Sequence, residues 1–356
     1  MMNQPVDSIL PEPREGEHPF APYVRILGRG KRGARSLSQA EARHAMSLIL
    51  QGDVEDTQLG AFLMLLRVKE ETAAELTGFV QAVREHTQVP TGLSVDLDWP
   101  SYAGKRRHPP WFLFAILLLA QHGLRVFIHG ADGHTPERLY LRPTLAAFGL
   151  APATSWTEAA QQLAARQFTY LPLAAWSPQL ADIIELRPIL GLRSPVHSLA
   201  RLINPLTAPV TLQGIFHPPY GPLHQESGRL LGYPRTVVIR GEGGESERNP
   251  DNALTVLRAN GAGDTDEVSW PALFERRHVK PKSLSLHHMY AVWSGAATDS
   301  YGEAAVLSTA ALALLETGAA ASQSAAWELA HTLWEHRDRH RFEQAPVATR
   351  PASPAV

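Results

Sequence analysis

The sequence contains no cysteine, which excludes disulfide bonds, thiolate metal sites, iron–sulfur clusters and cysteine nucleophiles. It also has no long apolar run. The longest, Trp111 to Ala120, is about half of the roughly 20 residues that a membrane-spanning helix needs. The first 16 residues lack the basic start and apolar stretch of a secretory signal. We therefore expect a cytoplasmic protein with no membrane segment.

The chain has little net charge. Its formal charge is −2 at pH 7, whereas nucleic-acid-binding domains are usually strongly basic. The charge is unevenly distributed, because twelve of the 33 lysines and arginines lie in three windows without an acidic residue: residues 25–35, 105–107 and 276–282. Sixteen histidines add positive charge just below neutral pH.

Length and composition predict a globular protein of more than one domain, because 356 residues, 44% of them hydrophobic, exceed what one core usually serves. Two capping boxes, Ser38 with Glu41 and Thr72 with Glu75, predict helices of a small all-helical domain over residues 23–90. Helices near residues 191–206, opened by Ser194-Pro195, are expected to pack on this domain.

After residue 90, short apolar strands alternate with helices, a pattern typical of an α/β domain with a mostly parallel sheet, here over residues 91–340. The expected strands are 125–129, 168–171 and 236–240, and the expected helices lie near 110–122, 136–148, 157–166 and 301–316. Residues 1–22 are predicted to be an arm, and residues 341–356 a flexible tail.

Several loops carry residues suited to phosphate or metal. Lys105, Arg106 and Arg107 precede a helix whose first amides also attract phosphate. Tyr102 beside them could stack on bases, or it could be buried next to a solvated charge run. Glu245 and Glu247, on a glycine-rich turn after a strand, could hold magnesium or form an acidic surface loop.

Two further motifs, one at a strand end and one rich in glycine, could bind a ligand or could be ordinary loops. His129 ends a strand, where ligands of α/β sheets bind, and it could pair with Asp132 and His134 around a metal, although no third ligand is in register. Gly28, Gly30 and Gly33 form a G-x-G-x-x-G motif, but a helical pattern stands where a dinucleotide-binding fold needs its second strand. We interpret that segment as a basic loop.

The order of these segments, over about residues 23–335, resembles glycosyltransferase family 3, the fold of anthranilate phosphoribosyltransferases and nucleoside phosphorylases. Phe127–Gly130 resembles the family's lysine-histidine-glycine-asparagine loop, and Glu185–Ser194 resembles the stretch with its anthranilate-contacting arginine, here Arg187. Val237–Glu247 resembles the strand and turn that hold magnesium. The resemblance implies a helical domain, a larger α/β domain and a homodimer paired through the helical domains.

The sequence departs from those enzymes where the substrate diphosphate would bind. In place of the glycine-rich pyrophosphate loop it has Pro100–Arg107, and in place of the paired Asp-Glu it has Glu245-Ser246, so that only Glu247 could supply a second carboxylate. Misplacing reacting groups by ~1 Å can cost about a hundredfold in rate. Phosphoribosyl transfer is therefore not expected.

These departures resemble the YbiB-type DNA-binding paralogues of the family. With the charge windows, they predict a homodimer that binds single- and double-stranded nucleic acid without reading its sequence and without a cofactor. The expected phosphate-binding or nucleic-acid-binding residues are Arg106, Arg107, Lys280 and Lys282, then Arg29, Lys31 and Arg32, with Lys105, Tyr102 and His129.

The alternative is an enzyme, a pentosyltransferase that uses magnesium to transfer phosphoribose to an aromatic or carboxylate acceptor. In that case Lys105, Arg106 and Arg107 would hold the pyrophosphate, Arg187 the acceptor, and Glu245 with Glu247 the magnesium ion. A third possibility is a structural partner of DNA-repair or replication proteins, docked through the arm and the tail.

Overall fold

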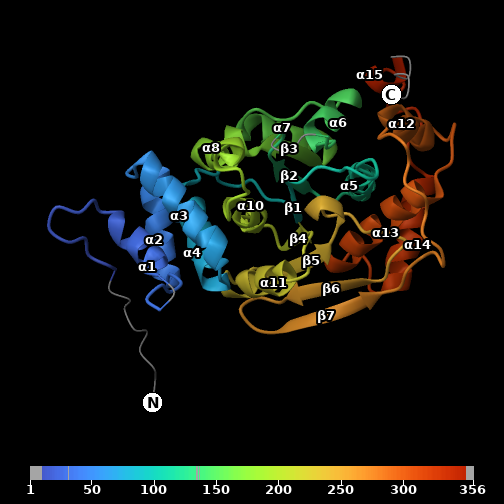
Figure 1. Cartoon of the computed structure of the whole chain (residues 1–356). Coiled ribbons are helices and arrows are strands. Elements are labelled where there is room, and N and C mark those ends of the chain that lie inside the picture. Colours follow the sequence, from blue (N-terminus) through green and yellow to red (C-terminus); the bar gives the residue numbers. More distant parts are fainter. Residues whose placement is uncertain (1–9, 31, 134, 136, 350–356) are drawn as a thin grey trace. The chain divides into compact units, whose positions relative to one another are not determined.

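The computed structural model describes residues 10–349 except 31, 134 and 136, and these form two compact units (Figure 1). One unit is helical and contains the described residues up to Gln88 together with Ser177–Ile203. The other is an α/β unit that contains Val89–Trp176 and the described residues from Asn204 onward. Among the described residues, none of the helices combines the length and apolar character that crossing a bilayer requires.

The helical unit begins with four helices, α1 (Ala21–Gly28), α2 (Gln39–Gln51), α3 (Asp56–Lys69) and α4 (Ala73–His86). Both predicted capping boxes are confirmed, at the starts of α2 and α4. Helix α2 packs on α4 and α1 on α3. The close packing of α2 on α4 requires Gly78, since a Cβ there would lie 2.2 Å from the Gln39 carbonyl oxygen.

Four short elements complete the helical unit: α8 (Pro178–Glu185), α9 (Arg187–Leu190), α10 (Val196–Leu199) and a 3₁₀ turn (Ala200–Leu202). Helix α10 begins directly after the predicted Ser194-Pro195 start and contacts α4. Gly28 is the last residue of α1, so the G-x-G-x-x-G motif follows a helix rather than a strand. The predicted arm reaches into this unit as well, because Phe20 is fully buried against Phe62.

The α/β unit contains one seven-stranded sheet in the order β3-β2-β1-β4-β5-β6-β7. Strands β1 to β5 pair in parallel, whereas β6 and β7 pair antiparallel at one edge. The prediction of a mostly parallel sheet is confirmed. The strands are β1 (Leu97–Ser101), β2 (Val126–Gly130), β3 (Phe168–Pro172), β4 (Val210–Ile215), β5 (Arg235–Arg240), β6 (Leu254–Ala259) and β7 (Thr265–Trp270).

Helices cover both faces of this sheet. Helices α5 (Phe112–His122), α13 (Ser300–Glu316) and α14 (Gln323–Glu335) pack on one another and share the core with one face. Along a strand, successive side chains point to opposite faces of the sheet. Helices α7 (Trp156–Arg166) and α11 (Tyr220–Leu230) contact Phe127 and Gln213, which alternate with the residues of the core face, and so cover the other face. The remaining elements are α6 (Leu141–Ala147), α12 (Leu286–Ser294), α15 (Pro346–Thr349) and 3₁₀ turns at Leu173–Ala175 and Glu242–Gly244.

The start of the expected tail is packed against the core. Phe342 and Val347 are buried, and the Phe342 ring contacts Phe148 and Trp293. The described residues 341–349 therefore differ from the expected flexible segment. Residues 350–356 lie outside the described part of the chain.

Candidate functional site at the carboxyl edge of the sheet

Two loops meet at the edge where strands β1 and β5 end, which is where open α/β sheets bind ligands. The backbone N–H groups of Ala103 and Gly104 donate to Glu245 Oε1 at 2.7 and 2.6 Å. Those of Arg106 and Arg107 donate to Glu242 Oε1, the first at 2.8 Å. We call these four N–H groups, with that of Phe112 at the start of α5, the amide cradle.

A buried ion pair closes the amide cradle. Lys105 Nζ lies 2.5 Å from Glu247 Oε1 and 3.2 Å from Glu242 Oε2, and its side chain is only 1% exposed. The second oxygen of Glu247 accepts the Phe112 N–H at 2.8 Å. Burial alone would lower the pKa of Lys105, but Glu247 and Glu242 outweigh it and raise that pKa above its usual value.

The carboxylate of Glu242 is held ionised by the same contacts. Burial opposes this charge, but Lys105 and the amides of Arg107 and Arg106 lower the pKa of Glu242 below its usual value. Carboxylates from Glu242, Glu245 and Glu247 thus stand where an anionic ligand would meet the loop amides and the first turn of α5.

Glycines let the two loops approach each other. Gly104 and Gly243 both have positive φ angles, +67° and +70°, and a Cβ on Gly243 would lie 2.8 Å from the Gly104 carbonyl oxygen. A two-way backbone bridge ties Lys105 to Leu139, with N···O distances of 2.9 and 2.8 Å. The loop that carries the amide cradle is therefore held from both sides.

Glu245 and Glu247, the expected magnesium ligands, already use three of their four oxygens within the protein. The fourth, Glu245 Oε2, is buried and has no hydrogen-bond partner. Magnesium prefers an octahedral set of oxygens that includes several waters, and this arrangement does not fit it. Across the described residues, His, Asp and Glu side chains form no group of three or more that could hold a metal ion.

Tyr102 and His129 are buried rather than placed at a surface that nucleic acid could reach. The Tyr102 hydroxyl lies 2.7 Å from His129 Nδ1, and His129 Nε2 lies 3.3 Å from Asp98 Oδ1. Thr211 Oγ1 donates to the other Asp98 oxygen at 3.2 Å. Tyr102, His129 and Lys105 were all expected to bind phosphate or nucleic acid, but each of them is buried and bonds a partner within the protein.

Asp132 lies on the loop after β2. Burial raises the pKa of Asp132 to about 6, although the nearby Arg142 opposes that shift. The expected metal pair would join Asp132 to His134, which lies outside the described residues.

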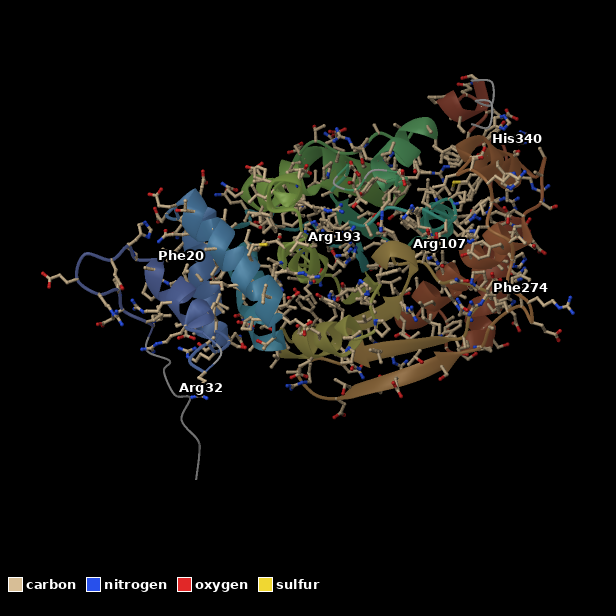
Figure 2. The ribbon with its side chains drawn as sticks, in the orientation of Figure 1. Phe20, Arg32, Arg107, Arg193, Phe274 and His340 are labelled. Carbon is tan, nitrogen blue, oxygen red and sulfur yellow. The ribbon has the colours of Figure 1, made fainter. Side chains whose placement is uncertain are left out.

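Two of the three basic windows place exposed cations on the α/β unit. The Arg106 side chain is 67% exposed and makes only a surface contact with Glu137 at 3.3 Å. Arg107 is also exposed, as are Arg276, Arg277, Lys280 and Lys282. Figure 2 labels Arg107, which belongs to the first of these windows, and Phe274, which lies two positions before the start of the 276–282 window.

The two windows meet at the ring of Tyr301. The ring of His108, next to Arg107, stacks on Tyr301 with centroids 3.8 Å apart. The ring of His278, within the second window, meets Tyr301 in an edge-to-face arrangement with centroids 5.8 Å apart. Residues 105–108 and 276–282 are therefore neighbours at the start of α13.

The third window and Arg187 belong to the helical unit. Arg29 and Arg32 are exposed, whereas Arg25 and Arg35 pair with Glu17 and Glu41. Lys31 lies outside the described residues. Arg187 is half-buried on α9.

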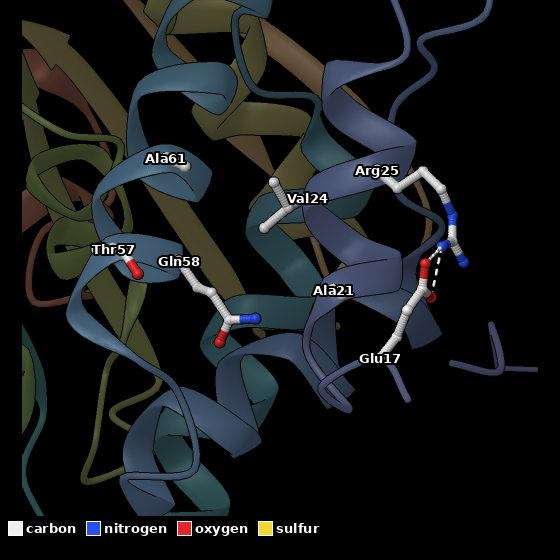
Figure 3. Close-up of a pocket in the computed structure, with 7 residues that line it drawn as sticks. All are labelled: Glu17, Ala21, Val24, Arg25, Thr57, Gln58 and Ala61. Atoms are coloured by element: carbon white, nitrogen blue, oxygen red, sulfur yellow. Dashed lines mark hydrogen bonds and ion pairs between the residues drawn. The ribbon is translucent and has the colours of Figure 1, made fainter. Parts of the chain in front are cut away.

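A groove of about 390 Å³ lies between α1 and α3 of the helical unit (Figure 3). Its walls are largely apolar, and the charged pair among them, Glu17 with Arg25, satisfies itself. The lining residues are Glu17, Ala21, Val24, Arg25, Thr57, Gln58 and Ala61. They include no histidine or cysteine that would point to catalysis.

Comparison with known proteins gives consistent similarities. Residues 22–87 match the helical bundle domain of the glycosyl transferase family. The chain is 30% identical over 237 residues to the uncharacterized protein YbiB of Escherichia coli K12, which covers 65% of this chain and 73% of that protein. It is 26% identical over 227 residues to the anthranilate phosphoribosyltransferase of Metallosphaera sedula, with 64% and 66% covered.

A solved structure shares the fold over nearly the whole chain. The crystal structure of anthranilate phosphoribosyltransferase from Thermus thermophilus matches with a TM-score of 0.70 at 19% identity. The match covers 92% of this chain and 98% of that one.

Proposed function

This chain belongs to glycosyltransferase family 3, the anthranilate phosphoribosyltransferase-like proteins, and on that premise we propose that it binds nucleic acid without transferring phosphoribose. The observation that carries the proposal is the amide cradle, whose N–H groups are bonded to the chain's own carboxylates. Exposed cations lie next to it.

A diphosphate would have to displace those carboxylates to use the cradle. Hydrogen bonds to charged groups contribute about 1.5–3 kcal/mol each, and five backbone N–H groups bond Glu242, Glu245 and Glu247. The carboxylates are part of the same chain, so they compete at a high effective concentration. Displacing Glu247 would also leave the ammonium of Lys105 buried with one fewer partner, which is costly.

The neighbouring cations remain available to a polyanion. Six of them, Arg106, Arg107, Arg276, Arg277, Lys280 and Lys282, are exposed on two adjoining loops of the α/β unit. Cations on loops contact phosphates and release counterions, and such contacts carry no sequence information. We therefore propose binding to single- and double-stranded nucleic acid with little sequence preference.

A homodimer paired through the helical units would double this set of cations. We include that pairing in the proposal because apolar residues of α1 and α3 line the groove of Figure 3, and Val68 on α3 is 82% exposed. An exposed apolar surface of this kind is typical of an interface.

The second candidate is phosphoribosyl transfer with magnesium. It is favoured by the similarity to proteins named anthranilate phosphoribosyltransferase, among them the one from Methanothermobacter marburgensis, which is 30% identical over 227 residues. This function requires Glu242, Glu245 and Glu247 to leave the amide cradle when the substrate binds.

The proposal is tested by titrating fluorescent single-stranded and duplex DNA of mixed sequence with the full-length protein at several salt concentrations. If roughly six phosphates are neutralised, the logarithm of affinity for duplex DNA should fall with the logarithm of salt at a slope of about −5. The double variants R106Q/R107Q and K280Q/K282Q should each make that slope shallower by about 2.

The matched control is R43Q/R84Q on helices α2 and α4, which removes the same charge from the helical unit and should leave the slope unchanged. A flat salt dependence, or an undiminished slope in both loop variants, would refute nucleic-acid binding by these cations.

A further inference from the structure

Asp251, His278 and Ser300 form a hydrogen-bonded row on the α/β unit that nucleic-acid binding does not require. Asp251 Oδ1 lies 2.7 Å from His278 Nδ1, and His278 Nε2 lies 2.9 Å from Ser300 Oγ. The second Asp251 oxygen accepts the backbone N–H of His278 at 2.9 Å. A carboxylate thus orients an imidazole whose far nitrogen meets a hydroxyl, which is the arrangement of a serine nucleophile with its base.

The carboxylate fixes both the position and the tautomer of His278. Because an ionised carboxylate only accepts hydrogen bonds, it places the ring proton on Nδ1 and leaves the lone pair of Nε2 facing Ser300. Phe274 and Tyr301 hold the ring in edge-to-face contacts, with centroids 4.5 and 5.8 Å away. The Asp251 side chain is 6% exposed and that of His278 is 26% exposed, so the orienting group is withdrawn from water while the base is accessible.

Ser300 is exposed and is the first residue of α13, a helix of 17 residues. The N–H groups of a first helical turn precede any bond within the helix and carry the positive end of its dipole. Asp299 caps one of them, that of Gly302, at 2.7 Å. The N–H groups of Ser300 and Tyr301 come before it, next to the hydroxyl, where they could stabilise an oxyanion formed on a group attached to Ser300.

We propose that Ser300 is an activated nucleophile of a second, hydrolytic site that accepts small carboxylic esters. Ser300 Oγ attacks the ester carbonyl carbon and its proton passes to His278 Nε2, while the oxyanion meets the first-turn N–H groups. The bond from that carbon to the leaving oxygen then breaks, and the alcohol departs with the proton from His278. Asp251 stabilises the imidazolium that forms between these steps.

Water completes the cycle. His278 removes a proton from a water molecule that attacks the acyl carbon, and the bond to Ser300 Oγ breaks. The carboxylic acid is released, and the proton held by His278 returns to Ser300. Every bond that forms is balanced by one that breaks, and water is the only co-reactant.

The experiment uses the full-length protein with p-nitrophenyl acetate and, separately, with a fluorophosphonate probe, followed by peptide mapping by mass spectrometry. We expect a stable adduct on Ser300 with the fluorophosphonate, none at this position in S300A, and faster release of p-nitrophenolate from the ester by the wild type than by S300A. In H278Q, labelling of Ser300 should be at least about 100-fold slower than in the wild type, because this variant lacks the base. D251N should have a similar effect, because its amide can donate to Nδ1 and favour the wrong tautomer.

Ser324 provides the matched control. It is an exposed serine in the first turn of α14, and its hydroxyl donates to Glu328 instead of meeting a histidine. In S324A, Ser300 should be labelled as fast as in the wild type. The absence of an adduct on Ser300, equal labelling of Ser300 and Ser324, or an unchanged rate in H278Q would overturn the proposal. A role of the row in merely holding the 276–282 loop would give no adduct on Ser300.

Discussion

At the scale of single residues, burial decides what each charge can do. Lys105 and Arg106 are neighbours in one basic window, yet the first is buried between two carboxylates and the second is exposed. The sequence shows the window but not which side chain turns inward, because that depends on partners about 140 positions away.

His108 shows how a histidine in a basic region is kept neutral. It is buried, and its ring stacks on Tyr301. Burial, and then the charge of Lys105, lower the pKa of His108 to about 4. This histidine therefore adds no positive charge just below neutral pH, contrary to what the count of histidines indicated.

The lowered pKa of His108 predicts a pH dependence of stability. An unfolded histidine has a pKa of about 6.5, so between pH 6.5 and 4 the unfolded state binds a proton that the folded state does not. The free energy of unfolding should therefore decrease as pH falls through this range. H108Q should lose less stability than the wild type between pH 7 and 5, by about 2 kcal/mol, measured by urea denaturation at both pH values.

The control for this measurement is H122Q, which removes an exposed histidine from the end of α5. It should retain the wild-type pH dependence. If H108Q loses as much stability as the wild type on acidification, His108 is not the neutral, buried group described above.

At the scale of elements, the sequence predicted those with a local signal. The capping boxes of α2 and α4 depend on residues three positions apart, and the structure confirms both. Strand β1 was missed because Asp98 and Pro100 interrupt its apolar pattern. Strand β7 was missed because it is an edge strand with mostly exposed residues.

The surface of α1 and α3 carries the prediction about assembly. If two copies pair through this surface, the wild-type protein should have twice the chain mass of 39.0 kDa by light scattering after gel filtration. V24E/A61E places two charges in the groove and should yield a monomer, because burying unpaired carboxylates in an interface is unfavourable.

V279E is the control, because Val279 is an exposed apolar residue of the α/β unit, away from the groove. It should leave the mass unchanged. A monomeric wild-type protein, or a dimer that persists in V24E/A61E, would exclude this mode of pairing.

At the scale of the whole molecule, the sequence identified the loops of the site but not their relationship. The basic loop was expected to bind phosphate, and the acidic turn was expected to bind magnesium held through phosphate. In the structure they bind each other, through Lys105 with Glu247 and through the amide cradle. Glu242 was missed as a site residue, although its place on the same acidic turn as Glu245 and Glu247 was a signal that it could join them.

The row formed by Asp251, His278 and Ser300 could not have been found in the sequence. Its members are 27 and 22 positions apart, and these spacings match no local periodicity. Only the packing of the 276–282 loop against the start of α13 brings them together.

In our proposal, the chain's own carboxylates occupy the place of a substrate diphosphate. The most direct test is calorimetry with phosphoribosyl pyrophosphate and magnesium, on the wild type and on E245A, which loses the acceptor of the Ala103 and Gly104 N–H groups. We predict no binding to the wild type under conditions where it binds DNA. Micromolar binding to the wild type that disappears in E245A would contradict the claim and favour phosphoribosyl transfer.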